Sequence, residues 1–554
     1  MTAVHQPATV AATLPAALAV TVASRPDAVA VRTADGASSL TWRALEEQAR
    51  RLAAVVRGLG VQPGDTVAVH LTNSLPFYVA DLGVVLAGAV PVPIYATASA
   101  EQIAHVADDA GVVAAITEAA FAPRLLEGLA GRSEVPVLCV EPGIAGTFGW
   151  DDRLVAAAPL TDAELYPARA DDLLTIIYTS GTTGRSKGVE LTHAALLGAT
   201  ASVAAFAELG EDGGRVVSWL PLAHIAERVA SYYGAVAYGL EVVVCPDPAA
   251  VAEVLPAARP TFFFAVPRFW EKLRAGIEAK IAALPEEIQQ AYEARTPEIL
   301  GALRQAVGLG EVRVASVGAA PCDPDLITFF HELGIPLGEI YGMTENAACC
   351  TVNPLGAVRI GSAGLPMPGV ELRIGDDGEV EMRGPSLMAR YRNLPDATVE
   401  AFTDDGFLRT GDIGRLDEDG YLWLFDRKKE ISIGAGGKNM SPSAIEAAIA
   451  SAGAEIGHVC AIGDRRPYNV ALVVPDRDVV GEPEAWPDDL DARIAAAVER
   501  GNARLARVEQ VKRFHVVRDA WLPGGRALTP TMKLRRRNVE ADYAEAIQAL
   551  YDEA

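Results

Sequence analysis

Helical and strand-like apolar patterns alternate along the chain from its start to about residue 420, and this order limits the fold more than any other feature. The segment Thr41–Leu59 repeats apolar side chains on one side and predicts an amphipathic helix. The apolar run Thr66–Leu71 follows it and predicts a buried strand. Further strand-like runs lie at Val90–Tyr95, Val112–Ile116, Leu173–Tyr178, Val216–Trp219, Val242–Cys245 and Thr261–Ala265. Many of them end in proline, glycine or small polar residues, where α/β proteins usually form their sites.

The length of 554 residues is too great for a single hydrophobic core, so two or more packed units are expected. Glu271–Val307 is charged and helix-forming, and it predicts a helical insertion on the surface. Gly361–Phe425 contains short strand-like runs separated by Pro-Gly and Asp-Gly turns, which predict a small β-rich subdomain. The charged run Asp426–Glu430 is the clearest boundary. We therefore predict an α/β protein, with a large N-terminal domain of layered α/β subdomains and the β-rich subdomain over residues 1–425, and a smaller α+β C-terminal domain over residues 426–554.

The composition excludes several classes of function. The chain carries 72 acidic and 48 basic residues, a formal net charge of -24 at pH 7, which opposes binding to nucleic acid and a purely electrostatic membrane anchor. The six cysteines are scattered without a C-x-x-C pair, which predicts reduced thiols and no zinc site. Two uncharged stretches, Gln6–Ser24 and Leu82–Ala100, are interrupted by prolines and predict neither a signal peptide nor a membrane span. We expect a cytoplasmic protein, and transient peripheral contact with the inner face of a membrane stays open.

The strongest chemical signal is the run Tyr178–Gly188, Tyr-Thr-Ser-Gly-Thr-Thr-Gly-Arg-Ser-Lys-Gly, which directly follows the apolar run Leu173–Ile177. Its glycines let the backbone bend tightly around an anion, its hydroxyls can donate to phosphate oxygens, and Lys187 adds a positive charge. It is not a Walker loop, because Ser186 precedes the lysine where a glycine would stand. A flexible linker is the alternative, but linkers seldom follow a buried strand directly. The candidate phosphate-binding residues are Thr179, Ser180, Gly181, Thr182, Thr183, Gly184 and Lys187.

Two further segments accompany this run. Gly318–Pro321 reads Gly-Ala-Ala-Pro, and Tyr341–Asn346 reads Tyr-Gly-Met-Thr-Glu-Asn. With the phosphate loop they resemble, in order, the adenylate-forming superfamily of acyl-CoA synthetases, luciferases and peptide-synthetase adenylation domains. The resemblance implies that Tyr341 contacts the adenine of ATP, Thr344 meets the α-phosphate and Glu345 helps to hold Mg²⁺. The small residues implied to lie around the adenine are Gly318, Ala319, Ala320 and Gly342.

The resemblance extends through the predicted domain boundary. Thr410-Gly-Asp resembles the motif whose aspartate, here Asp412, binds both ribose hydroxyls, and Arg427 resembles the arginine that shares the ribose. By the same alignment Lys429 is the hinge about which the C-terminal domain turns, so this domain is expected to be mobile. A solvated charge cluster is the alternative for Lys428 and Lys429.

The C-terminal domain carries two segments that resemble functional parts of the family. Gly434–Gly437 resembles a loop that helps to form the thiol tunnel, where Gly436 and Gly437 would leave room for the pantetheine arm of coenzyme A. Leu528–Arg536 resembles the segment that bears the catalytic lysine, here Lys533. Adenylation brings two anions together, and a cation between them stabilises the transition state. Arg535–Arg537 is interpreted either as a contact for the phosphates of coenzyme A or as a solvated basic turn.

Two segments narrow the substrate class. Ser218–Arg228 and Arg259–Lys272 resemble the versions found in long-chain fatty acyl-CoA synthetases. His224 is then implied to lie near the reacting carboxylate or the acyl entry, with a core histidine as the alternative. Several aromatic residues could line an acyl channel, although a packed core predicts the same composition: Trp219, Tyr232, Tyr233 and Phe262–Phe264.

The resemblance covers nearly the whole chain and implies a long-chain fatty acid–CoA ligase. Such an enzyme joins ATP and a fatty acid into an acyl-adenylate, releases diphosphate, and transfers the acyl group to coenzyme A with release of AMP. One alternative is a fatty acyl-AMP ligase that loads a carrier protein. Another is a non-catalytic acyl- or nucleotide-binding homologue, although Lys187, Glu345, Asp412 and Lys533 are all present. The sequence does not determine the preferred acyl chain length of the substrate or the oligomeric state of the protein.

Overall fold

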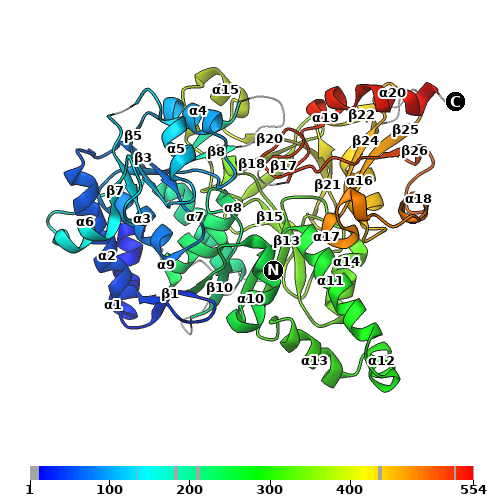
Figure 1. Ribbon diagram of the computed structural model, residues 1–554, viewed down its shortest axis with the longest axis horizontal. Helices are drawn as coiled ribbons and strands as arrows, with labels where there is room; N and C mark the ends of the chain where they lie inside the picture. Colours follow the sequence, from blue (N-terminus) through cyan, green and yellow to red (C-terminus); the bar gives the residue numbers. More distant parts are fainter. Residues whose placement is uncertain are drawn as a thin grey trace.

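The computed structural model describes residues 11–132, 134–179, 185–207, 213–433, 439–529 and 532–552. In these segments, strands β1–β21 form five sheets and strands β22–β26 form two others. Figure 1 shows the second group at one end of the molecule, with the helices that follow it in the chain. The large N-terminal part and the smaller C-terminal part thus have separate sheets, in agreement with the predicted α/β architecture.

The first sheet is parallel, in the order β4-β3-β5-β6-β7, and it contains several of the predicted strands. The predicted helix Thr41–Leu59 is confirmed as α2, which begins at Trp42 because the Thr41 hydroxyl caps it by accepting a hydrogen bond from the Ala44 amide. The strands are β3 (Thr66–His70), β4 (Val90–Pro93), β5 (Val112–Thr117), β6 (Val137–Cys139) and β7 (Phe148–Gly149). The helices are α2 (Trp42–Gly58), α3 (Leu75–Leu86), α4 (Ala100–Ala110), α5 (Ala122–Gly128) and α6 (Trp150–Ala156).

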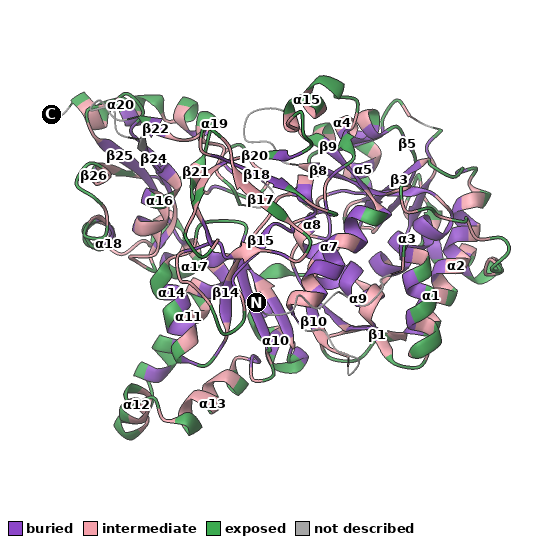
Figure 2. Ribbon diagram, turned by 180° about the vertical axis from the view of Figure 1, so that it is seen from behind, coloured by how far each residue is buried: buried purple, intermediate pink, exposed green. Residues whose placement is uncertain are grey.

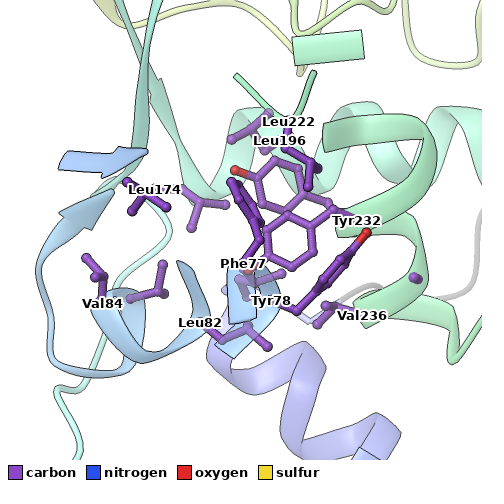
Figure 3. Close-up of a cluster of buried hydrophobic side chains, with 14 of the residues drawn as sticks. Phe77, Tyr78, Leu82, Val84, Leu174, Leu196, Leu222, Tyr232 and Val236 are labelled. Atoms are coloured by element: carbon purple, nitrogen blue, oxygen red, sulfur yellow. The ribbon is translucent and has the colours of Figure 1, made fainter. Parts of the chain in front are cut away.

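The second sheet, β10-β11-β1-β2, packs beside the first through an apolar core that includes residues of α2, α3 and α6 and of the helices around the second sheet. Figure 3 shows this core where Phe77 and Tyr78 of α3 meet Tyr232, with the ring centroids of Tyr78 and Tyr232 5.3 Å apart. The strands are β1 (Val29–Thr33), β2 (Ser39–Thr41), β10 (Arg215–Ser218) and β11 (Glu241–Val244). The helices are α1 (Leu14–Ser24), α7 (His193–Phe206), α8 (Ile225–Glu227), the π-helix η1 (Arg228–Tyr233) and α9 (Gly234–Tyr238).

The third sheet, β12-β13-β14-β15-β16, is parallel at its first three strands and carries two of the predicted site segments at strand ends. The predicted helical insertion is confirmed as three helices, and Figure 2 shows α12 and α13 largely unburied. The strands are β12 (Phe262–Ala265), β13 (Val314–Gly318), β14 (Leu337–Tyr341), β15 (Thr351–Val352) and β16 (Leu365–Pro366). The helices are η2 (Pro248–Ala250), α10 (Val251–Ala258), α11 (Pro267–Ala282), α12 (Glu286–Glu293), α13 (Pro297–Ala306), α14 (Pro324–Glu332) and η3 (Thr344–Asn346).

Two small sheets complete the N-terminal part. The sheet β19-β9-β8 holds the phosphate-loop segment, and the antiparallel sheet β17-β18-β20-β21 is the predicted β-rich subdomain. The predicted boundary between residues 425 and 426 falls inside β21, which stays paired with β20 up to Arg427. The elements are β8 (Leu173–Thr179), β9 (Lys187–Thr192), β17 (Glu371–Ile374), β18 (Glu379–Arg383), β19 (Arg390–Tyr391), α15 (Pro395–Ala401), β20 (Leu408–Leu416) and β21 (Leu422–Arg427).

The C-terminal part has its own apolar core around the sheet β24-β25-β26. The C-terminal part contacts helix α11 of the N-terminal part. Asp476 pairs with Arg268, and Asp478 Oδ2 lies 2.5 Å from Lys272 Nζ. The elements are β22 (Ser432–Ile433), β23 (Asn439–Met440), α16 (Pro442–Ala450), β24 (Ile456–Ile462), β25 (Asn469–Pro475), α17 (Arg477–Val480), η4 (Pro483–Ala485), α18 (Leu490–Asn502), β26 (Val511–Val516), α19 (Arg536–Asp542) and α20 (Ala544–Asp552).

Two expectations from composition can be compared with the described segments. None of the helices that they contain is long and apolar enough to cross a membrane. All six cysteines lie in these segments as free thiols, and five of the six are buried. Within the same residues, no group of three or more His, Cys, Asp or Glu side chains could hold a metal ion.

Candidate nucleotide and acyl site

The phosphate-loop segment lies between two antiparallel strands. Thr179 ends β8 and is paired with Lys187, the first residue of β9, and its hydroxyl lies 3.4 Å from the Lys187 carbonyl oxygen. His105 of α4 contacts the Ser186 carbonyl oxygen through Nε2 at 2.9 Å. The two ends of the loop are therefore held together by the sheet. The predicted residues between them lie outside the described segments: Ser180, Gly181, Thr182, Thr183 and Gly184.

Lys187 and Glu345 both contact one tyrosine, Tyr391, that the sequence did not single out. Tyr391 of β19 donates its hydroxyl hydrogen to Glu345 Oε1 at 2.7 Å. The Lys187 Nζ lies 4.5 Å from the centroid of the same ring. Tyr391 is 8% exposed, and burial together with the nearby Glu345 raises its pKa. A candidate phosphate ligand and a candidate metal ligand thus share one contact, although no local pattern marked it.

The predicted adenine segments meet at the ends of two adjacent parallel strands. Gly318 ends β13 and is paired with Ile340 of β14, so close that a Cβ atom on Gly318 would lie 2.4 Å from the Ile340 carbonyl oxygen. Ala319 has a φ of 66°, in the left-handed region that a non-glycine residue adopts at some cost. A Cβ atom on Gly342 would lie 2.3 Å from the backbone carbonyl carbon of Ala348. Small residues are therefore required on both segments, and the strained turn is typical of a functional loop.

Asp412 contacts two of the other predicted residues. Tyr341 donates its hydroxyl hydrogen to Asp412 Oδ2 at 2.5 Å, and Arg427 Nε lies 3.2 Å from Asp412 Oδ1. The contacts arise because β20 and β21 pair Asp412 with Arg427, directly across the ladder. Burial raises the pKa of Asp412, and the positive charge of Arg427 opposes this shift. The predicted ribose residues therefore lie next to the predicted adenine residue.

Lys533 of the C-terminal part faces this cluster across the boundary between the two parts. Its ammonium group interacts electrostatically with Arg427, Asp412 and Glu345. Its side chain reaches solvent, but the surrounding protein displaces part of the water around it, and this desolvation lowers the pKa of Lys533. The positive charge of Arg427 lowers this pKa further, and the carboxylates of Asp412 and Glu345 oppose the shift. The preceding Met532 has a φ of 65°, so the turn that presents the lysine is strained.

His224 interacts electrostatically with Lys533. It precedes α8, and its Nδ1 accepts a hydrogen bond from the Ala226 amide at 3.2 Å. Burial lowers the pKa of His224 to about 3, and the positive charge of Lys533 adds to the effect. The imidazole is consequently neutral at pH 7. The predicted place of His224 near the reacting groups stays a prediction.

Thr344 lies beside Glu345 in a tight turn. It begins the short 3-10 helix η3 and is buried, and the residues that follow this helix, Ala347 and Ala348, both adopt the left-handed conformation. Two successive left-handed alanines turn the chain sharply back after η3. The turn is fixed from outside as well, because the backbone amide of Met388 donates to the Glu345 carbonyl oxygen at 2.8 Å.

A buried carboxyl group on the neighbouring strand was missed by the sequence reasoning. Glu339 lies two residues before Tyr341 on β14, on the same face of the strand, and its Oε2 finds no hydrogen-bond partner among the described residues. Burial raises the pKa of Glu339 to about 8, so the carboxyl group is mostly protonated at pH 7. The sequence signal for such a residue is an acidic side chain within an otherwise apolar strand. Glu339 fits it, since it lies between Leu337 and Ile340.

Several sequence interpretations are decided by packing. Most of the aromatic side chains proposed for an acyl channel lie in packed cores, with Tyr232 and Tyr233 fully buried, whereas Phe264 is only partly buried. Within the basic turn Arg535–Arg537, Arg536 points inward and lies 2.6 Å from Glu446 Oε1, whereas Arg537 is exposed. Lys428 is likewise paired, since its Nζ lies 2.9 Å from Glu379 Oε2. Gly436 and Gly437 lie outside the described segments, so the predicted thiol loop stays a prediction.

The cluster can bind a nucleotide with its polyphosphate. It presents a flat aromatic ring between close-packed backbone segments, a buried carboxylate for sugar hydroxyls, and cations at Lys187, Arg427 and Lys533 for phosphate oxygens. Glu345 is a single carboxylate, which suits Mg²⁺ because this ion is usually held by one or two carboxylates together with substrate phosphates. The residues therefore fit a magnesium nucleotide and not a preformed all-protein metal cage.

Known proteins are similar to this chain over most of its length. A protein of Mycobacterium tuberculosis, fadD11, which carries the name of a fatty-acid–CoA ligase, is 43% identical over 424 residues, covering 69% of this chain and 74% of that one. The Long-chain-fatty-acid–CoA ligase FadD15 of the same species is 32% identical over 565 residues, covering 93% and 92%. Among solved structures, ATP-bound MatB from Rhodopseudomonas palustris is similar at 25% identity and a TM-score of 0.74, over 96% of this chain and 99% of that one.

Family models agree with these relatives. Residues 430–554 match the AMP-binding enzyme C-terminal domain, a range that begins at the last residue of the charged run Asp426–Glu430. Residues 18–392 match the AMP-binding enzyme family and include the phosphate loop, the adenine segments and Glu345. By these matches, the chain belongs to the AMP-binding enzyme family.

Proposed function

We propose that this chain is a long-chain fatty acid–CoA ligase, which converts ATP, a fatty acid and coenzyme A into acyl-CoA, AMP and diphosphate through an acyl-adenylate. The observation that carries the proposal is the convergence of Arg427, Asp412 and Glu345 on Lys533, because it gathers the charges for acyl-adenylate formation in one place. The names of the relatives that align over almost the whole chain support the fatty acid and coenzyme A as substrates.

The nucleotide is held by residues of the N-terminal part. The adenine lies between Tyr341 and the Gly318–Ala320 turn, where Glu339 can exchange a hydrogen bond with the base. Asp412 accepts hydrogen bonds from the ribose hydroxyls, and Arg427 shares this contact. The phosphate loop with Lys187 holds the phosphates. Glu345 binds Mg²⁺, which neutralises phosphate charge when it is bound.

The first half-reaction joins two anions, the fatty carboxylate and the α-phosphate. Lys533 places a positive charge between them, and the Thr344 hydroxyl donates to an α-phosphate oxygen. A carboxylate oxygen of the fatty acid attacks the α-phosphorus atom. The bond from this phosphorus to the oxygen that bridges to the β-phosphate breaks, and diphosphate leaves. His224, which is neutral, lines the approach of the carboxylate without adding charge.

The second half-reaction needs space where Lys533 now lies. The C-terminal part turns about Lys429, withdraws Lys533, and brings the loop with Gly436 and Gly437 towards the adenylate. The thiol of coenzyme A then attacks the acyl carbonyl, and AMP leaves. We place the boundary of the moving part just after β21, because Arg427 is still held in the ladder with Asp412.

The present orientation is held by ion pairs between the two parts, and reversing the charges on α11 should weaken it. Arg268 pairs with Asp476, Lys272 Nζ lies 2.5 Å from Asp478 Oδ2, and Arg504 Nη1 lies 2.5 Å from Asp323 Oδ2. We expect Arg268→Glu with Lys272→Glu to slow acyl-adenylate formation roughly fivefold, since partly exposed pairs contribute little each. Thioester formation from supplied acyl-adenylate should not slow.

Stopped-flow measurement of the two half-reactions checks this expectation. Arg274→Glu is the matched control, because Arg274 lies on the same helix but pairs with Glu278 of that helix at 2.9 Å. Equal slowing of both half-reactions in the α11 double variant would contradict a role of these pairs in orienting the C-terminal part.

The proposed function is tested with purified protein, MgATP, coenzyme A and fatty acids from short to very long chains. Mass spectrometry follows acyl-CoA, acyl-AMP and AMP. We expect acyl-CoA and AMP to appear together, with the largest yield from long chains. Acyl-AMP that accumulates without thioester would indicate a ligase that loads a carrier protein. Absence of AMP with every fatty acid would overturn the fatty-acid assignment.

A further inference from the structure

Tyr391 lies between the two groups that would handle the charge of a magnesium nucleotide. We propose that Tyr391 is a positioning residue that sets the geometry of Lys187 and Glu345 before MgATP binds, an inference that rests on the proposed function. Its hydroxyl donates to Glu345 Oε1 at 2.7 Å, and Lys187 Nζ lies 4.5 Å from its ring centroid. One side chain therefore contacts a lysine and a carboxylate that are far apart in sequence and opposite in charge.

The backbone that carries Tyr391 is tied to both loops. On one side, the amide of Arg392 donates to the Gly188 carbonyl oxygen at 2.7 Å, directly after Lys187. On the other side, the amide of Met388 donates to the Glu345 carbonyl oxygen at 2.8 Å. Residues 388–392 thus connect the strand after the phosphate loop with the turn that bears the candidate magnesium ligand. These two connections fix the backbone on both sides of Tyr391.

A second set of contacts fixes the same strand from behind. Arg392 Nη1 lies 3.0 Å from Glu190 Oε1, and Glu190 is almost fully buried. Arg392 Nη2 also donates to the carbonyl oxygen of Ala110 at the end of α4. Asn393 then turns the chain with a φ of 54°. This anchoring makes Tyr391 a rigid support rather than a side chain that follows its ligands.

The two contacts of Tyr391 serve different purposes. Lys187 and Glu345 carry opposite charges and attract each other, and each has its own contact on Tyr391. The ring holds the ammonium by a cation–π contact, which is weak enough for phosphate oxygens to replace. The hydroxyl occupies one oxygen of Glu345 and leaves the other for a metal ion.

The test measures binding, without fatty acid, so that no turnover occurs. Tyr391→Phe keeps the ring and removes the donor, and we expect Mn²⁺, titrated into the enzyme–ATP complex and followed by electron paramagnetic resonance, to bind about tenfold more weakly. Metal-free ATP, titrated by calorimetry, should bind this variant with unchanged affinity. Tyr391→Leu removes the ring as well, and we expect metal-free ATP also to bind it several-fold more weakly.

The matched control is Tyr421→Phe. Tyr421 is also buried, and its hydroxyl donates to the Ala357 carbonyl oxygen at 2.7 Å, away from Lys187 and Glu345. This variant should bind Mn²⁺ and ATP like the unmodified chain. Unchanged Mn²⁺ affinity in Tyr391→Phe would overturn the proposal, and so would equal weakening in both phenylalanine variants. If the unmodified chain bound no ATP at all, the proposed function would fail instead, and the two failures are thus distinguishable.

Discussion

Lys533→Ala is expected to slow acyl-adenylate formation by roughly 10²–10³-fold, because removing one preorganised donor to the developing charge costs about 3–4 kcal/mol. The charge of Lys533 interacts with Arg427, Asp412 and Glu345, so its removal takes a cation from the place where the charged groups meet. The loss should appear in kcat with little change in the affinity for ATP, since the lysine acts where the two anions meet. Fatty-acid-dependent exchange of labelled diphosphate into ATP measures this half-reaction.

The second half-reaction separates a chemical role from a structural one. When acyl-AMP is supplied with coenzyme A, the Lys533→Ala variant should form acyl-CoA at nearly the normal rate, because Lys533 has left the site by then. Lys512→Ala is the matched control, since Lys512 is an exposed lysine of the same part and its Nζ donates only to Gln510 in the described structure, at 3.0 Å. Normal diphosphate exchange in Lys533→Ala would show that another group supplies the charge.

Asp81→Ala is expected to lower the free energy of unfolding by about 3–5 kcal/mol, because it leaves a buried cation without its partner. Asp81 and Arg228 are both fully buried, and Arg228 Nη2 lies 2.7 Å from each carboxylate oxygen. Arg228 Nε also donates to Tyr233 Oη at 2.8 Å, within the aromatic cluster that Figure 3 shows around Phe77 and Tyr232. Urea unfolding followed by circular dichroism measures the loss.

The double variant Asp81→Leu with Arg228→Met shows where the cost lies. Replacing a buried ion pair by apolar side chains of similar volume is often nearly neutral, so much of the stability should return. The same pair links α3 to the π-helix η1, which follows His224 in the chain. The activity of the double variant therefore also reports whether these two charges matter for the reaction. If the double variant were as unstable as Asp81→Ala, shape rather than charge would determine the stability of this core.

The order of the elements was predictable because periodicity and turn residues are local properties of the chain. The helix predicted at Thr41–Leu59 is α2, and the strand predicted at Thr66–Leu71 is β3. The β-rich segment before Phe425 is likewise found as the sheet β17-β18-β20-β21. The exact end of β21 was not predictable, because the ladder pairing of Arg427 with Asp412 outweighs the charged composition of its last residues.

The sequence by itself determined the family and most of the charged groups of the site, since Lys187, Glu345, Asp412, Arg427 and Lys533 lie in short motifs that can be recognised one by one. Only the tertiary structure decided which of these groups meet, and it added Tyr391 and Glu339, which no motif marked. It also turned Arg536 inward and buried Tyr232 and Tyr233 in a packed core. The physical reason is that burial and electrostatic partners depend on contacts between distant segments, whereas motifs and periodicity depend on neighbours along the chain.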